Sequence, residues 1–237
     1  MKLNESEIKN ITEVLINCEL FENFDGKSII SILECFSPKV YSYNKGDYIV
    51  MAGGRYQGVG ILLEGNGVVT KENAAGNRVM MSLIKPGSIF GEVIAFSGTE
   101  KWPSNVQAQT NCRVMFIENE MILNQCSDAC SYHSQLIRNL LKSVSTRAIM
   151  LNRRVEYLSM KGINSKIASF LLENMGKAGS NTFRLPVNRN EMAEFLNISR
   201  PSMSREMGIM RDMGIIEFQK EAVKIIDAEK LKSMIEE

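Results

Sequence analysis

The sequence has no long hydrophobic run, and no stretch approaches the roughly 18 apolar residues that cross a bilayer. Its opening, "MKLNESEIKNITEVL", also lacks the charged-then-apolar layout of a signal peptide. We therefore expect a cytoplasmic protein without a membrane partner. A length of 237 residues and 44% apolar content are enough for one large or two ordinary domains with true cores.

Histidine and paired cysteines are also scarce. The one histidine is His133, and no Ser/His/Asp set or pair of catalytic carboxylates emerges, so we expect no enzyme. The cysteines are odd in number and form no CxxC pair, which argues against a disulfide framework or a zinc ribbon and predicts reduced thiols. They are Cys18, Cys35, Cys112, Cys126 and Cys130.

Cys126, Cys130 and His133 have helical spacing, and their side chains suit zinc, haem iron or an iron–sulfur cluster. A metal or redox sensor is therefore one alternative. Cys126 is expected in a separate short helix, however, and buried cysteines commonly act as small hydrophobic residues. We interpret His133 as an interface residue and predict no metal site or required cofactor.

The net charge of +1 conceals a segregation along the chain. Residues 138 to 211 contain thirteen lysines and arginines against five acidic residues, whereas the remainder has fifteen against 22. A basic segment of this kind suits a polyanion, although a solvated basic face gives the same count.

Short segments separated by turns fill the first half. Residues 3 to 36 show the spacing of amphipathic helices. After Pro38, turn signals such as "NKGD", "EGNG" and "KPG" separate short runs such as "GILL" and "VMFI". Many short strands at nearly regular spacing predict a β-barrel or roll over 38 to 118.

A helix over residues 128 to 161 is predicted next, because more than thirty residues pass without glycine or proline. Its apolar positions alternate steps of four and three, as in a coiled coil. One domain cannot cover so long a seam, so we predict a dimer, with a core helix of a single chain as the alternative. The seam is Ile137, Leu141, Val144, Ala148, Leu151, Val155 and Leu158.

A helix-turn-helix is predicted from Asn188, with a first helix that ends near Leu196 and a second helix within the stretch Asn197 to Ile216. Asn188 and Glu191 have the spacing of a capping box, and Asn197 tolerates a left-handed turn. Ser199 then caps a second helix with Pro201 in its first turn. The strand-like runs "IIEF" and "VKII" flank the polar "QKEA" and predict a hairpin that packs beside the helices as a wing.

The second helix buries Met203, Met207 and Met210, which leaves arginines and serines facing outward near its N-terminus. Arginine can donate two hydrogen bonds to guanine, serine is a short donor or acceptor, and the helix start favours phosphate. Arg189 is placed for a backbone contact. The predicted DNA-binding residues are Asn188, Arg189, Ser199, Arg200, Ser202, Ser204 and Arg205.

The combination of "KPGSIFGEV", the uninterrupted helix and "ISRPSMSRE" resembles the CRP/FNR family of bacterial transcription regulators. The resemblance implies an α+β fold: a jelly-roll-like β-roll sensor domain with flanking helices (1–127), a long dimerisation helix (128–161) and a winged helix-turn-helix (162–237). It also implies that Arg200 and Arg205 read bases. Pro201 stands where cyclic AMP-responsive members have a glutamate, so the operator should differ at that base pair.

The same resemblance places the effector site in the roll. Gly91 and Glu92 match the start of the nucleotide-binding cassette, but its phosphate-binding arginine and serine fall on Trp102 and Pro103. We therefore expect an effector other than cyclic AMP, with Gly91, Glu92, Trp102 and Ser104 as candidate contacts. Trp102, Ile94 and Phe96 could line a pocket for an apolar ligand or belong to the roll core.

The prediction is a homodimeric regulator that binds a palindromic operator in double-stranded DNA under control of an unidentified small molecule. If it activates, RNA polymerase is a partner. The alternative is a ligand-sensing module that acts through a protein partner, with the winged helix as its interaction surface.

Overall fold

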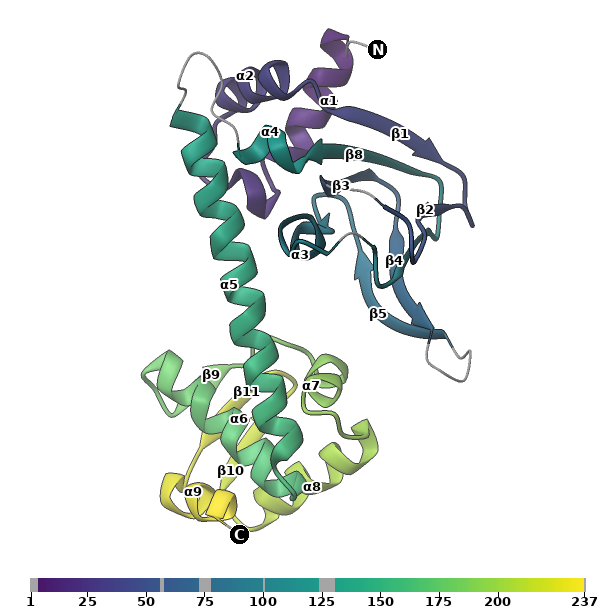
Figure 1. Ribbon diagram of the computed structural model, residues 1–237. Helices are drawn as coiled ribbons and strands as arrows, with labels where there is room; N and C mark the ends of the chain where they lie inside the picture. The colour runs from purple at the N-terminus through teal and green to yellow at the C-terminus, as the bar shows by residue number, and fades with distance from the viewer. Residues whose placement is uncertain (1–3, 56–57, 73–77, 100, 124–130, 237) are drawn as a thin grey trace. The chain divides into compact units, whose positions relative to one another are not determined.

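The computed structural model describes residues 4–55, 58–72, 78–99, 101–123 and 131–236. The chain forms two compact units, Met1–Thr146 and Arg147–Glu237. Figure 1 labels most of the helices and strands of the two units. Within the described ranges, no helix is both long enough and apolar enough to cross a membrane.

A helical cluster opens the first unit. It comprises α1 (Glu5–Leu15), the short 3-10 helix η1 (Glu19–Phe21), α2 (Gly26–Phe36) and, after the strands, α4 (Asn119–Leu123). Asn4 and Glu7 form a capping box at the start of α1, and Asp25 accepts from the Ser28 backbone at the start of α2. The helices bury a shared core that includes Ile11, Leu15, Phe21, Ile29 and Ile32.

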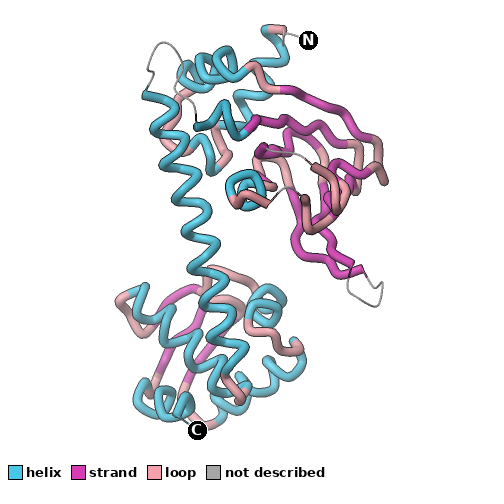
Figure 2. Tube along the Cα trace, viewed as in Figure 1, coloured by secondary structure: helices cyan, strands magenta, loops and turns pink. Residues whose placement is uncertain are grey.

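Eight strands form the predicted roll, which is confirmed (Figure 2). One antiparallel sheet has the order β1-β8-β3-β6 and the other β2-β7-β4-β5. A short helix, α3 (Glu92–Phe96), follows β6. The strands are β1 (Lys39–Tyr43), β2 (Tyr48–Val50), β3 (Gly58–Glu64), β4 (Gly67–Glu72), β5 (Arg78–Ile84), β6 (Ile89–Phe90), β7 (Asn105–Ala108) and β8 (Cys112–Glu118).

The long helix α5 (Ser131–Ser159) lies within the predicted range of 128 to 161 and contributes residues to both units. Its 29 residues span about 43 Å at 1.5 Å per residue. In the first unit, buried Asn139 donates to the carbonyls of Leu20 and Glu22, at 3.0 and 2.8 Å. These bonds fix the beginning of α5 on the helical cluster.

The second unit is a winged helix-turn-helix, as predicted. The wing hairpin is joined by a third strand, giving a sheet of order β10-β11-β9. The elements are α6 (Ile163–Ala178), β9 (Thr182–Arg184), α7 (Arg189–Phe195), α8 (Arg200–Asp212), β10 (Ile216–Gln219), β11 (Ala222–Ile225) and α9 (Ala228–Glu236).

The end of α5 is anchored on α6 by one carboxylate. Glu173 accepts a hydrogen bond from the buried Tyr157 hydroxyl at 2.8 Å and pairs with Arg153 and Lys177, each at 2.8 Å. Burial would raise the pKa of Glu173, but its partners outweigh burial and hold it below its ordinary value. Tyr157 also packs edge-on against Phe195.

Candidate nucleic-acid interface and the interior of the roll

The turn between α7 and α8 has the predicted local structure. Asn188 accepts from the backbone of Glu191, whose carboxylate accepts from the Asn188 backbone at 2.9 Å. Asn197 adopts a left-handed conformation, with φ of 52°, and allows the tight turn. Ser199 caps α8 by accepting from the Ser202 backbone at 3.2 Å, which completes the helix-turn-helix.

The recognition helix α8 has two distinct faces. Met203, Met207 and Met210 are buried in the core of the second unit. Arg200, Ser204 and Arg205 are exposed, and no hydrogen bond or ion pair joins their side chains to another residue that the structure describes. Their donors are therefore directed to solvent at the positive end of a helix, a place suited to an anionic partner.

Three other predicted contact residues already have structural partners. The side-chain oxygen Oδ1 of Asn188 accepts from two backbone amides, those of Asn190 and Glu191. The Ser199 hydroxyl donates to the Ser202 hydroxyl at 2.7 Å. These side chains hold the starts of α7 and α8, and direct DNA contacts by them stay predictions.

Arg189 is turned towards the wing. Its guanidinium donates to the Lys220 carbonyl at 2.9 Å, lies 4.9 Å from the centre of the Phe218 ring and contacts the sulfur of Met207. Burial lowers the pKa of this guanidinium, as does the charge of nearby Arg200, while Glu221 opposes the shift. Arg189 thus joins α7, α8 and the wing, and the phosphate contact expected from the sequence stays a prediction.

The wing turn supplies a residue that sequence reasoning did not single out. Lys220 is exposed at the tip of the hairpin in a left-handed conformation, with φ of 52°. Phe218, behind it on β10, has a second guanidinium nearby, that of Arg211 at 5.8 Å. The polar run "QKEA" between two strand-like runs was the available signal for a lysine at the wing tip.

The predicted dimer seam is largely uncovered in the single chain. Leu141, Leu151, Val155 and Leu158 expose 61%, 63%, 57% and 48% of their surface, and Ala148 is also exposed. Ile137 and Val144 differ, because they pack partly against the helical cluster of their own chain. Most of the seam therefore lacks a partner among the described residues.

Of the four candidate effector residues, Gly91 and Trp102 are in contact and Glu92 is buried beside Gly91. Gly91 has φ of 84° and Glu92, which begins α3, is 2% exposed. Trp102 is 4% exposed and lies in the roll core with Phe90, Leu62 and Ile84. Ser104 is half-buried next to the start of β7. Of the two readings of Trp102, pocket wall or core residue, its burial favours the core.

A cyclic nucleotide does not fit this arrangement. Its phosphodiester carries a full negative charge, which needs a cation or several donors when it is buried. Trp102 and Pro103 bring no charge to the positions where the cassette places an arginine and a serine. The indole is instead in close contact with Gly91, because a Cβ atom built on Gly91 would come 2.7 Å from Cζ2 of Trp102.

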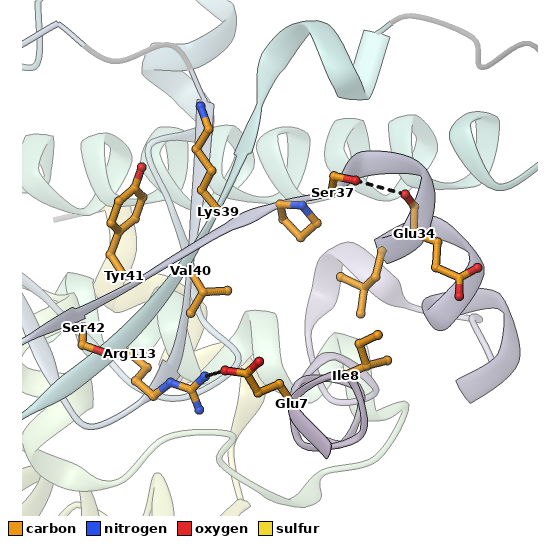
Figure 3. Close-up of a pocket in the computed structure, with 11 residues that line it drawn as sticks. Glu7, Ile8, Glu34, Ser37, Lys39, Val40, Tyr41, Ser42 and Arg113 are labelled. Atoms are coloured by element: carbon orange, nitrogen blue, oxygen red, sulfur yellow. Dashed lines mark hydrogen bonds and ion pairs between the residues drawn. The ribbon is translucent and has the colours of Figure 1, made fainter. Parts of the chain in front are cut away.

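A groove of about 1140 Å³ lies elsewhere on the first unit, between α1, α2 and the edge strand β1 (Figure 3). Ile8 and Val40 face each other across it, and Arg113 reaches Glu7 at 3.6 Å. None of the four predicted effector residues lines this groove. The groove and the roll interior are therefore separate features.

The proposed metal ligands are only partly described. Cys126 and Cys130 lie outside the described residues, whereas His133 is 3% exposed with its ring 5.0 Å from that of Phe36. Across the ranges that the structure covers, no three His, Cys, Asp or Glu side chains gather as a metal site. Burial raises the pKa of the Cys18 thiol to about 11, so this cysteine behaves as a core residue.

Comparison with known proteins matches both units. Residues 40–129 match the model of the cyclic nucleotide-binding domain, and residues 165–234 match that of the Crp-like helix-turn-helix domain. The first match covers the roll and agrees with its fold. The second match covers the helix-turn-helix of the second unit.

Curated relatives agree with these matches. The global nitrogen regulator of Nostoc sp. is 23% identical over 198 residues, covering 80% of this chain and 86% of the relative. The transcriptional activator protein FnrA of Stutzerimonas stutzeri is 28% identical over 145 residues, covering 58% and 57%. The crystal structure of the Thermus thermophilus catabolite activator protein matches 92% of this chain and 98% of its own, with a TM-score of 0.53 and 18% identity, and so supports the fold.

A winged helix-turn-helix joined to a cyclic nucleotide-binding-type roll defines a DNA-binding transcription regulator rather than an enzyme. The two domain matches and the relatives identify the family, and the chain belongs to the CRP/FNR family of transcription regulators.

Proposed function

We propose that the protein is a homodimer that reads a palindromic operator with Arg200 and Arg205 of each copy and responds to an effector other than cyclic AMP. One observation carries the proposal: both arginines are exposed without a partner among the described residues, at the start of a helix whose other face is buried. Such a helix presents donors to base edges in the major groove.

Base reading is assigned to the two arginines because a guanidinium donates two parallel hydrogen bonds to O6 and N7 of guanine. Pro201, between them, has no side-chain acceptor for the amino group of cytosine. The resulting operator differs, at the corresponding base pair, from those of relatives that carry a glutamate there.

Phosphate contacts are assigned to the wing tip and to the basic surface of the second unit. Lys220 is exposed at the turn between β10 and β11, and the segment 138–211 is strongly basic. Neutralising phosphates releases counterions, so binding should weaken steeply as salt is raised.

Dimerisation is assigned to α5, where the exposed leucines recur at the spacing of a coiled coil. A second copy of the same helix covers this seam most simply, because a two-fold axis places identical surfaces together. Two recognition helices related by that axis meet half-sites about one helical turn apart. If the protein activates transcription, RNA polymerase is the further partner.

The experiment is selection of bound duplexes from a random DNA pool with the full-length protein, with and without cell extract. We expect a palindromic motif, a steep dependence of its affinity on salt, and a dimer in sedimentation analysis. The variant Leu151→Glu, which puts charge into the seam, should sediment as a monomer and lose the two-fold motif.

Failure to enrich any motif under either condition, together with duplex binding that salt does not change, would contradict the proposal. That outcome would favour the rival function, a sensing module that acts through a protein partner. A single half-site motif with an unchanged Leu151→Glu variant would contradict the dimer alone.

A further inference from the structure

We propose that the indole of Trp102 is the permanent occupant of the roll interior, so that the protein binds no cyclic nucleotide and reads DNA without one. The clause about DNA rests on the proposed function, whereas the clause about the roll does not. The domain family implies a nucleotide in the roll, but the side chains around Trp102 do not suit one.

The backbone of Trp102 is fixed on both sides. Its amide donates to the Gly54 carbonyl at 3.0 Å, and its carbonyl accepts from the Gly53 amide at 2.8 Å. This pair of bonds ties residue 102 to the turn after β2 and directs the side chain inward. The indole is 4% exposed, which is a core position for a residue of this size.

The ring is held by close contacts with Gly91 and Phe90. Gly91 packs directly under its six-membered ring, and a Cβ atom there would overlap Cη2 and Cζ2 of the indole. Phe90 meets the indole at an angle of 65°, with ring centroids 6.3 Å apart. These edge-to-face contacts are the favourable arrangement for aromatic rings.

A second interlock holds Phe90 in turn. Its ring packs against Gly60 of β3, where a Cβ atom would overlap the ring edge, and it meets Phe116 of β8 at 5.9 Å. Two glycines thus cradle two aromatic rings across β3, β6 and β8. Moving Trp102 aside for a ligand would expose the indole to water and open a cavity beside Phe90.

Charge supports the same conclusion. The indole provides one N–H donor and no positive charge, so replacing it by a cyclic phosphate would bury an anion in an apolar cluster that includes Val106 and Ile84. Lys101 is exposed to solvent and does not belong to this core. Any regulatory input therefore enters elsewhere than through a nucleotide in the roll.

Trp102 is the single tryptophan, so the emission of the full-length protein reports on this ring alone when it is excited at a wavelength that tyrosine does not absorb. We expect blue-shifted emission, weak quenching by acrylamide, and no change of either with millimolar cyclic AMP or cyclic GMP. Operator affinity and melting temperature should also be the same with and without the two nucleotides.

The variant Trp102→Gly adds a chemical test. Removing the indole leaves a cavity of its shape, and free indole should raise the melting temperature of this variant by several degrees in a saturable manner, because a ligand that binds only the folded state stabilises it. Phe21→Ala is the matched control: it opens a cavity in the helical cluster, and indole should not stabilise it.

Three results would each overturn the inference: strong quenching of the wild-type emission, a red shift on adding either nucleotide, or a nucleotide-dependent rise in melting temperature or operator affinity. The wild-type measurements decide even if Trp102→Gly does not fold. These measurements also separate failure of this inference from failure of the proposed function, because a protein that selects no DNA can still show a buried tryptophan that does not respond to nucleotides.

Discussion

The recognition helix and the roll interior differ at the positions where the family resemblance places ligand contacts. On α8 these positions are Arg200 and Arg205, which are charged, exposed and without a partner among the described residues. In the roll the corresponding position is Trp102, which is uncharged and buried by Phe90 and Gly91. The arginines of α8 face solvent, whereas residue 102 of the roll belongs to a hydrophobic core.

A match to a domain family therefore predicts the fold of the backbone better than it predicts which ligand the domain binds. The sheets of the roll follow from apolar runs that alternate with turns, and this pattern does not depend on whether residue 102 is an arginine or a tryptophan. Binding depends on the charge and shape of a few side chains, and in the roll an indole stands where the family resemblance places an arginine. Each of the two regions can be broken separately.

The largest effect should come from Phe90→Ala in the roll. Truncating a buried aromatic ring costs about 3–5 kcal/mol of unfolding free energy, because a cavity replaces its contacts with Trp102 and Phe116. Urea unfolding followed by Trp102 fluorescence should shift to lower urea. The control Val93→Ala, at an exposed position of α3, should stay within about 0.5 kcal/mol of the parent, and a similar shift there would contradict the closed-core description.

Arg200→Ala should break the other region, where binding rather than stability changes. Loss of a two-fold guanine contact should cost about 1–3 kcal/mol in operator affinity and relax one base pair per half-site. Stability should stay within about 0.5 kcal/mol, because the side chain is exposed. Competition binding measures the ratio of the affinities for operator and scrambled duplexes. The variant Lys9→Ala on α1 controls for the loss of one charge. An unchanged ratio would remove Arg200 from base reading.

Arg189→Lys tests an arginine of the DNA-binding unit that contacts the wing instead of facing solvent. Lysine keeps the charge but loses the planar group that bonds the Lys220 carbonyl and lies over Phe218. We expect about 1–2 kcal/mol weaker binding to operator and scrambled DNA alike, because the wing is released. If Arg189→Lys bound normally and only Arg189→Ala failed, a simple phosphate contact would explain the residue better.

The smallest effect is a dependence on pH at the junction of α5 and α6. The folded-state pKa of Glu173 lies below its ordinary value of 4.5, so its stabilisation is full above that pH and is lost as the pH falls through the folded value. Glu173→Gln should therefore lower stability by about 1 kcal/mol or less at pH 7, a small value because the carboxylate is partly exposed, and the difference should vanish in acid. Thermal melts across this range test it, with Glu229→Gln on α9 as the control; a constant difference would contradict the assignment.

Local signals in the sequence predicted much of the second unit. Asn188, Glu191, Asn197 and Ser199 specify helix ends through bonds to their own neighbours, so their roles follow from spacing alone. The strand-like and polar runs that predicted the wing, and the turn signals that predicted the roll, are also short-range patterns. Arg189 could not be placed in this way, because its partners, Lys220 and Phe218, lie some thirty residues further along the chain.

Short-range periodicity and capping were enough to predict the order of the domains, the capped helices and the face of α8 that carries the arginines. Contacts between distant elements were needed to place Trp102 in the core rather than in a pocket wall and to turn Arg189 towards the wing. Gly91 and Phe90 pack against the indole of Trp102, and the hairpin turn lies beside Arg189 of α7. Close packing then fixes these side chains in place.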